Sequence, residues 1–115
     1  MNLLIIEENA AMCRLIRALV EGLPLSITEC RHGSQALAVC AQVQPDWILL
    51  DLNLARADAL AAAQRIRATS PQARVVLLAE EDSTRLQEAA LQAGACGYLL
   101  KDNLIEVRRL LEASP

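Results

Sequence analysis

The chain has 115 residues, which is enough for one ordinary domain and too few for two hydrophobic cores. Hydrophobic residues make up 54% and charged residues 22%, with four glycines and four prolines, and this composition excludes a disordered or low-complexity chain. The formal net charge of −3 gives no electrostatic reason for contact with nucleic acid or an anionic membrane, so we expect this chain to bind neither directly.

The first apolar run and the cysteines favour a cytoplasmic protein. Residues 3–6 are apolar, but Glu7 and Glu8 end the run far short of the roughly 18 to 20 residues of a membrane span, and no signal peptide begins in this way. The four cysteines lie far apart without a Cys-x-x-Cys spacing, at Cys13, Cys30, Cys40 and Cys96. We interpret them as reduced thiols of the core, which is typical of the cytoplasm.

Short apolar runs alternate with longer stretches whose apolar residues recur every three or four positions. The short runs predict five strands, at residues 2–6, 26–31, 47–51, 74–79 and 97–101. Because nearly all of them are continuously apolar, we expect strands of a parallel sheet covered on both faces. Trp47 begins the third run, and we expect it to serve packing.

The longer stretches carry apolar stripes that predict five helices, each able to cover one face of the sheet. Ser83 is the expected N-cap of the fourth helix, and Asn103 with Glu106 resembles a capping box at the fifth. Together with the right-handed crossover rule, the pattern predicts an α/β fold of (βα)5 type with a doubly wound, five-stranded parallel sheet.

Polar residues follow the strands at the edge where ligands bind in such sheets. Glu7 and Glu8 follow the first predicted strand, Asp51 ends the third and Lys101 ends the fifth. Converging carboxylates repel one another and favour a cation such as Mg²⁺, while the lysine could hold a phosphoryl oxygen. The alternative is that these are ordinary polar strand ends, with Glu7 and Glu8 in a solvated turn.

Four blocks of sequence, in order, resemble the receiver domain of two-component response regulators. They are Leu-Leu-Ile-Ile-Glu-Glu-Asn (3–9), Pro-Asp-Trp-Ile-Leu-Leu-Asp-Leu-Asn-Leu (45–54), Val-Val-Leu-Leu-Ala (75–79) and Gly-Ala-Cys-Gly-Tyr-Leu-Leu-Lys-Asp (94–102). The last block is similar to the NarL-type subgroup, which usually carries a helix-turn-helix DNA-binding domain after the receiver. The resemblance implies one receiver domain over residues 1–115 and the flavodoxin-like strand order 2-1-3-4-5.

This resemblance also implies roles for individual residues. Asp51 would accept a phosphoryl group from a sensor histidine kinase or phosphotransfer protein, with Lys101 pairing with the phosphoryl oxygens. Mg²⁺ would be held by Asp51, by Glu7 and Glu8, and by the backbone carbonyl of Asn53, with Glu8 at the main ligand position. The family also often forms homodimers through the first and fifth helices or the fourth helix and fifth strand, and we expect a weak homodimer.

Three features depart from the family pattern. Ala79 stands where the family has a Ser or Thr whose hydroxyl bonds the phosphoryl group, and Tyr98 matches the aromatic switch residue that this hydroxyl normally controls. The loop at residues 54–59 lacks the usual Pro and Gly, which alters the turn beside the metal site. Glu8 replaces the usual Asp and adds a methylene where Mg²⁺ demands close geometry.

Two functions therefore stay open at this point. The chain is either a phosphorylatable switch, controlling transcription through an output domain, or a degenerate receiver that acts as an interaction or dimerisation module. A small flavodoxin-like or hydrolase enzyme is a third class. His32 is the only histidine and there is no glycine-rich phosphate loop, so we do not expect an enzyme.

Overall fold

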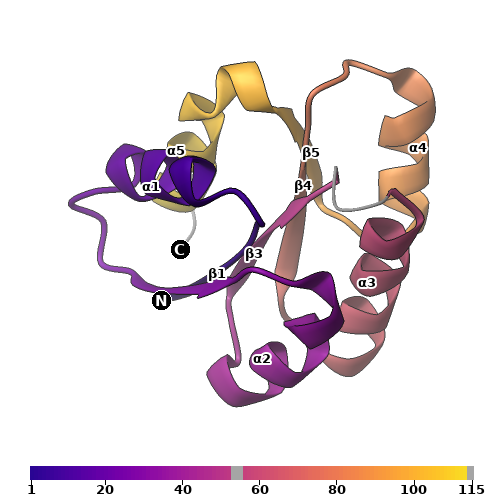
Figure 1. The fold of residues 1–115 in the computed structure, drawn as a ribbon, viewed down its shortest axis with the longest axis horizontal. Coiled ribbons are helices and arrows are strands. Elements are labelled where there is room, and N and C mark those ends of the chain that lie inside the picture. Colours follow the sequence, from indigo (N-terminus) through magenta and orange to yellow (C-terminus); the bar gives the residue numbers. More distant parts are fainter. Residues whose placement is uncertain (53–55, 114–115) are drawn as a thin grey trace.

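The computed structural model describes residues 1–52 and 56–113, with the side chains of 56–58 outside the description. Five parallel strands form one sheet in the order β2-β1-β3-β4-β5 (Figure 1). The strands are β1 Asn2–Ile6, β2 Ser26–Cys30, β3 Trp47–Asp51, β4 Arg74–Ala79 and β5 Gly97–Leu100. The predicted α/β class and the flavodoxin-like order are both confirmed.

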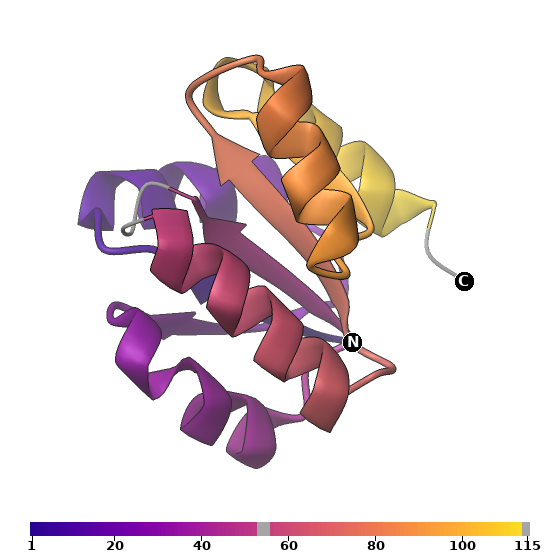
Figure 2. The same cartoon turned by 90° about the vertical axis from the view of Figure 1, so that its right-hand side faces the viewer.

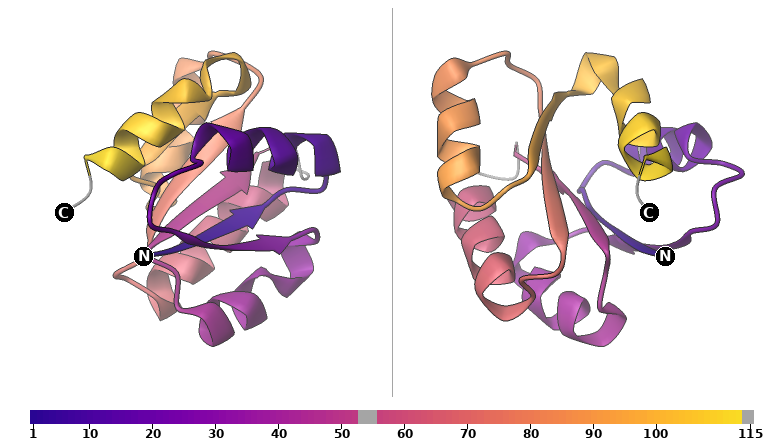
Figure 3. Two further views of the ribbon diagram at one scale, coloured as in Figure 1. Left: turned by 90° about the vertical axis from the view of Figure 1, so that its left-hand side faces the viewer. Right: turned by 180° about the vertical axis from the view of Figure 1, so that it is seen from behind.

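Five α-helices cover the two faces of this sheet. They are α1 Ala10–Leu19, α2 Ala36–Val43, α3 Arg56–Thr69, α4 Thr84–Gln92 and α5 Ile105–Glu112, with short 3₁₀ helices η1 Gly33–Gln35 and η2 Lys101–Asn103. Helices α2, α3 and α4 lie on one face (Figure 2), and α1 and α5 lie on the other (Figure 3). No helix in the described part of the chain is both long and apolar enough to cross a membrane.

The alternation of side chains along each strand divides the core in two. Leu4 and Ile6 of β1 pack toward α2, α3 and α4, whereas Leu3 and Ile5 pack toward α1 and α5. Trp47 joins the second cluster at 5% exposure, with the guanidinium of Arg74 5.2 Å from its ring centroid. Its predicted packing role is confirmed.

The prediction that all strands are covered on both faces is wrong for the two edge strands, β2 and β5. Only Cys30 is buried in β2, and every residue of β5 is partly exposed. The second and fifth strands also end one residue earlier than predicted, at Cys30 and Leu100, because Lys101 already belongs to η2. Cys96 is exposed in the turn before β5, so its predicted core role is wrong, whereas the other three thiols are buried.

Helix ends were predicted with mixed success. Ser83 caps α4 as expected, because its hydroxyl accepts the N–H of Leu86. The predicted capping box at α5 is wrong: Leu104 takes the N-cap position without a side-chain hydrogen bond, and Glu106 pairs with Arg109 instead. The 3₁₀ turn of η2 uses Asn103 before the α-helix begins.

Arg108 joins α5 to the end of α1. Its Nη1 donates to the carbonyl oxygens of Leu19 at 3.1 Å and Glu21 at 2.7 Å. Its Nε also pairs with Glu112 at 2.8 Å. A positive charge on the last carbonyls of a helix is favourable for both their hydrogen bonding and the helix dipole.

Candidate functional site

The ends of four adjacent strands bring the predicted residues together at one edge of the sheet. Asp51 is the last residue of β3, which lies between β1 and β4, and Ala79 ends β4. Glu7 directly follows β1, and Lys101 directly follows β5. Since the strands are parallel, their carboxyl ends all meet here, and the site has a rigid floor.

Asp51, Lys101 and Glu7 form a partly buried charged group. The ammonium Nζ of Lys101 lies 2.9 Å from Asp51 Oδ1 and 3.7 Å from Glu7 Oε2. Glu7 is 2% exposed and Asp51 is 4% exposed. Two carboxylates thus share one cation in a place that water reaches poorly.

This sharing perturbs the titration of the group. Burial, followed by the negative charge of Asp51, raises the pKa of Glu7 from 4.5 to about 7. Its Oε2 is buried and accepts no hydrogen bond. Burial alone would lower the pKa of Lys101, but its hydrogen bond and ion pair with Asp51 outweigh burial and raise that pKa above its ordinary value.

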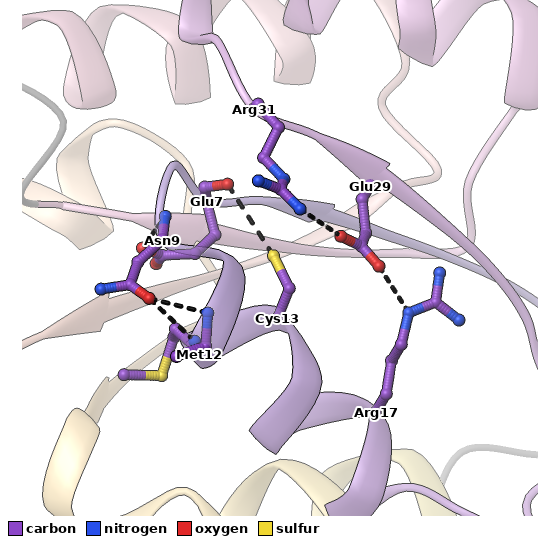
Figure 4. A network of polar contacts seen from close by, with 8 residues as sticks. Glu7, Asn9, Met12, Cys13, Arg17, Glu29 and Arg31 are labelled. Atoms are coloured by element: carbon purple, nitrogen blue, oxygen red, sulfur yellow. Dashed lines mark hydrogen bonds and ion pairs between the residues drawn. The ribbon is translucent and has the colours of Figure 1, made fainter.

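The turn into α1 fixes the position of Glu7 (Figure 4). Asn9 is the N-cap of α1: its side-chain oxygen accepts the N–H groups of Ala11 and Met12, and its own N–H donates to Glu7 Oε1 at 3.2 Å. The thiol of Cys13 donates to the carbonyl oxygen of Glu7 at 3.8 Å. Burial and nearby Glu29 raise the pKa of Cys13 to about 11, so this thiol keeps its proton.

A second polar group lies beside this turn on β2 and α1 (Figure 4). Glu29 pairs with both Arg17 and Arg31, and the hydrogen bond from Arg17 lowers the pKa of Glu29. Our sequence reasoning identified neither this group nor the Asn9 cap. An Asn just before the apolar stripe of α1 is a recognised capping signal that would have found the latter.

Glu8, unlike its buried neighbour Glu7, is exposed, and it directly precedes the Asn9 cap of α1. Within the described residues, no three His, Cys, Asp or Glu side chains are grouped to hold a metal ion. Asn53 lies outside the described residues. Of the three predicted carboxylates, the structure brings Glu7 and Asp51 together around Lys101, and a metal-binding role for Glu8 stays a prediction.

The donor set of the two buried carboxylates nevertheless fits a divalent cation. Oxygen ligands suit Mg²⁺, which typically uses one or two protein carboxylates and keeps several waters. The orphaned Oε2 of Glu7 is a ligand atom without a hydrogen-bond donor in the structure. A cation beside it would replace the missing partner and offset the repulsion from Asp51.

Ala79 and Tyr98 are the two residues that the sequence predicts to form a switch. Ala79 is 1% exposed, and its methyl group offers no hydrogen-bond donor to the site. The half-buried ring of Tyr98 packs against the core under α2, α3 and α4, while its hydroxyl donates to the carbonyl oxygen of Glu81. The predicted loop at 54–59 is shorter than expected because α3 already begins at Arg56; residues 54 and 55 lie outside the described part.

Comparison with known proteins covers nearly the whole chain. A family model described as the response regulator receiver domain matches residues 3–113. The nitrate/nitrite response regulator protein NarP of Escherichia coli K12 is 34% identical over 114 residues, which cover 97% of this chain and 52% of NarP. The chain spans between about a quarter and about half of the length of the curated relatives that it matches.

Solved structures share the fold. The BeF3-activated receiver domain of Klebsiella pneumoniae RstA is 26% identical, with a TM-score of 0.83 and coverage of 99% of this chain and 100% of that domain. A response regulator of Burkholderia pseudomallei, with a phosphorylated aspartic acid, calcium ion and citrate, is 23% identical with a TM-score of 0.82. The matched region covers 92% of this chain and 62% of the Burkholderia chain.

Proposed function

We propose, because this chain belongs to the family of response regulator receiver domains, that Asp51 accepts a phosphoryl group and that this modification carries a signal. Receiver domains are signalling modules, and the chain acts as a switch and not as an enzyme that releases a product. The observation that carries the proposal is the buried Asp51 carboxylate at the end of β3, 2.9 Å from Lys101 Nζ.

The transfer is a displacement at phosphorus. A carboxylate oxygen of Asp51 attacks the phosphorus atom of a phosphohistidine or of a small acyl phosphate, and the bond from phosphorus to the donor nitrogen or oxygen breaks. The leaving group takes the bonding electron pair, and a histidine leaving group takes up a proton. Lys101 stays within reach of the phosphoryl oxygens and offsets their charge as a point charge.

We propose Mg²⁺ as the cofactor of this step. Glu7 and Asp51 would hold it, with Glu8 and the carbonyl of Asn53 as further ligands. Bound there, the cation supplies charge neutralisation between the carboxylates and the incoming phosphoryl group. The calcium ion in the Burkholderia response regulator supports a divalent cation in this family.

The partners follow from the family. A sensor histidine kinase or a phosphotransfer protein would supply the phosphoryl group, and an output domain, of helix-turn-helix type in the NarL-like subgroup, would control transcription. The similarity to NarP supports this reading. A weak homodimer and a cytoplasmic location stay predictions.

Intact mass spectrometry tests the proposal directly. The chain is incubated with acetyl phosphate and Mg²⁺, and we expect the mass to rise by one phosphoryl group. The mass of the Asp51→Asn variant should not rise. Asp102→Asn, the same substitution at an exposed residue, should gain one phosphoryl group like the unchanged chain. Omission of Mg²⁺ should slow the reaction strongly.

One observation favours a second function. Buried Ala79 lacks the hydroxyl that the family pattern places beside the phosphoryl group. If neither acetyl phosphate nor a phosphorylated histidine donor modifies Asp51, the chain is a degenerate receiver that binds partners without phosphotransfer. The same mass measurement therefore separates the two functions.

A further inference from the structure

A cavity of about 370 Å³ lies between α2 and α3, which are neighbours on one face of the sheet (Figure 2). Its described walls include Ala36 and Leu37 of α2, Leu50 of β3, and Ala59 and Ala62 of α3. The buried group of Glu7, Asp51 and Lys101 does not line it. The cavity is thus separate from the proposed phosphorylation site.

The space exists because α3 presents alanines where it approaches α2. Ala59, Ala61 and Ala62 all line the cavity, and a methyl group fills less of the space between the helices than a larger apolar side chain would. The cavity is partly open to solvent, and a bound apolar group would displace water from its apolar walls. Cavities of a few hundred Å³ with apolar walls and a few polar groups are typical of small-molecule sites.

The polar groups of the cavity lie at its exposed side and favour an anion. Arg65 and Ser34 both line the cavity and are exposed. Among the described residues, the guanidinium of Arg65 has no ion pair or hydrogen bond; only its main-chain carbonyl is engaged, by the hydroxyl of Thr69.

We propose that this cavity binds a small amphipathic carboxylate, with its hydrocarbon part against the alanines and its carboxylate at Arg65 and Ser34. The volume corresponds to about a dozen water molecules at roughly 30 Å³ each, which suits a medium-length aliphatic chain. The arginine fork matches a carboxylate, and the apolar walls select against small inorganic anions.

The test is an NMR titration of the full chain with sodium octanoate, and with 1-octanol as the neutral match. We expect saturable amide shifts concentrated at residues 33–37 and 59–65. Arg65→Gln should weaken octanoate about tenfold and leave octanol unchanged, since it removes only the charged contact. Arg67→Gln, on the same helix but with its side chain against Gly94, should leave both affinities unchanged.

Ala62→Leu provides an independent test of the location, because the larger side chain fills the space. It should weaken octanoate and octanol alike, about tenfold or more. Equal octanoate affinity in Arg65→Gln and the unchanged chain overturns the assignment to a carboxylate. Shifts that are absent at roughly 10 mM octanoate, or that centre on α4 and β5, overturn the site itself. The shift map and Arg65→Gln decide the question even if Ala62→Leu does not fold. None of these readouts depends on phosphorylation of Asp51.

Discussion

Replacing Glu7 by Gln should stabilise the metal-free domain, although it removes a residue of the proposed metal site. Glutamine has the shape of protonated glutamate and carries no charge into the buried position. The pKa of Glu7 rises from 4.5 to about 7 on folding, with burial as the main cause and repulsion from Asp51 second. The ionised side chain therefore costs folding free energy at neutral and alkaline pH.

The magnitude and the pH window follow from this pKa. Between pH 4.5 and about 7 the unfolded chain has lost the proton of Glu7 while the folded chain keeps it, so the stability of the unchanged protein falls as the pH rises. At about 1.4 kcal/mol for each pH unit, the full difference is about 3 kcal/mol at pH 8 and less than about 1 kcal/mol at pH 5. In Glu7→Gln the free energy of unfolding should no longer fall with rising pH in this range.

Urea unfolding at pH 5 and pH 8 measures the difference. Trp47 is the only tryptophan and is buried, so its fluorescence reports unfolding of the sheet. Glu8→Gln is the matched control: the same change at the exposed neighbour should stay within about 0.5 kcal/mol at both pH values. A Glu7→Gln protein that is no more stable at pH 8 than Glu8→Gln would refute the reasoning.

Three further outcomes are expected. Mg²⁺ at a hundredfold excess over Kd should add about 2.7 kcal/mol to the free energy of unfolding of the unchanged chain, and so raise its melting temperature in a thermal shift assay. The melting temperature of Asp51→Asn should rise much less. Arg108→Ala should lose about 1.5 to 3 kcal/mol of stability in urea unfolding, because the carbonyls of Leu19 and Glu21 lose a charged donor, whereas Arg109→Ala should be nearly neutral. A beryllofluoride adduct should shift the ring signals of Tyr98 little in the unchanged chain and more in Ala79→Thr; equal large shifts in both would contradict this.

Most of the fold could be predicted because β1, β3 and β4 are continuous apolar runs with turn residues between them. Because both faces of these strands are buried, their residues are apolar throughout, and the length and composition of each run both indicate a buried strand. The edge strand β2 was predicted less well, because its mixed residues depend on which neighbour covers them. The N-cap of α5 was predicted wrongly for a similar reason. Asn103 is the last residue of the 3₁₀ helix η2 and does not cap α5, and the sequence pattern alone does not indicate this short helix.

The candidate site was predictable only in part. Strand ends in a parallel sheet must meet, so Asp51 and Lys101 come together from residues far apart in the chain. The sequence pattern could not say which of the adjacent Glu7 and Glu8 turns inward, because that depends on the hydrogen bond from Asn9. The cavity beside α3 was also beyond prediction, since it depends on the distance and rotation between two packed helices.

The position of Tyr98 bears on how a phosphoryl signal could leave the site. A modification shifts a two-state equilibrium only by the difference in its interaction with the two states. In this chain Ala79 contributes no hydrogen bond to a phosphoryl group, and the Tyr98 hydroxyl is already bound to the carbonyl of Glu81 before any modification. Phosphorylation therefore gains little by moving this ring. The larger change available to it is at the shared Lys101, because a phosphoryl group with up to two negative charges replaces the single charge of the Asp51 carboxylate and competes more strongly with Glu7 for the same ammonium group. Glu7 is tied through Asn9 and Cys13 to α1, so we expect the response to be strongest at the start of that helix.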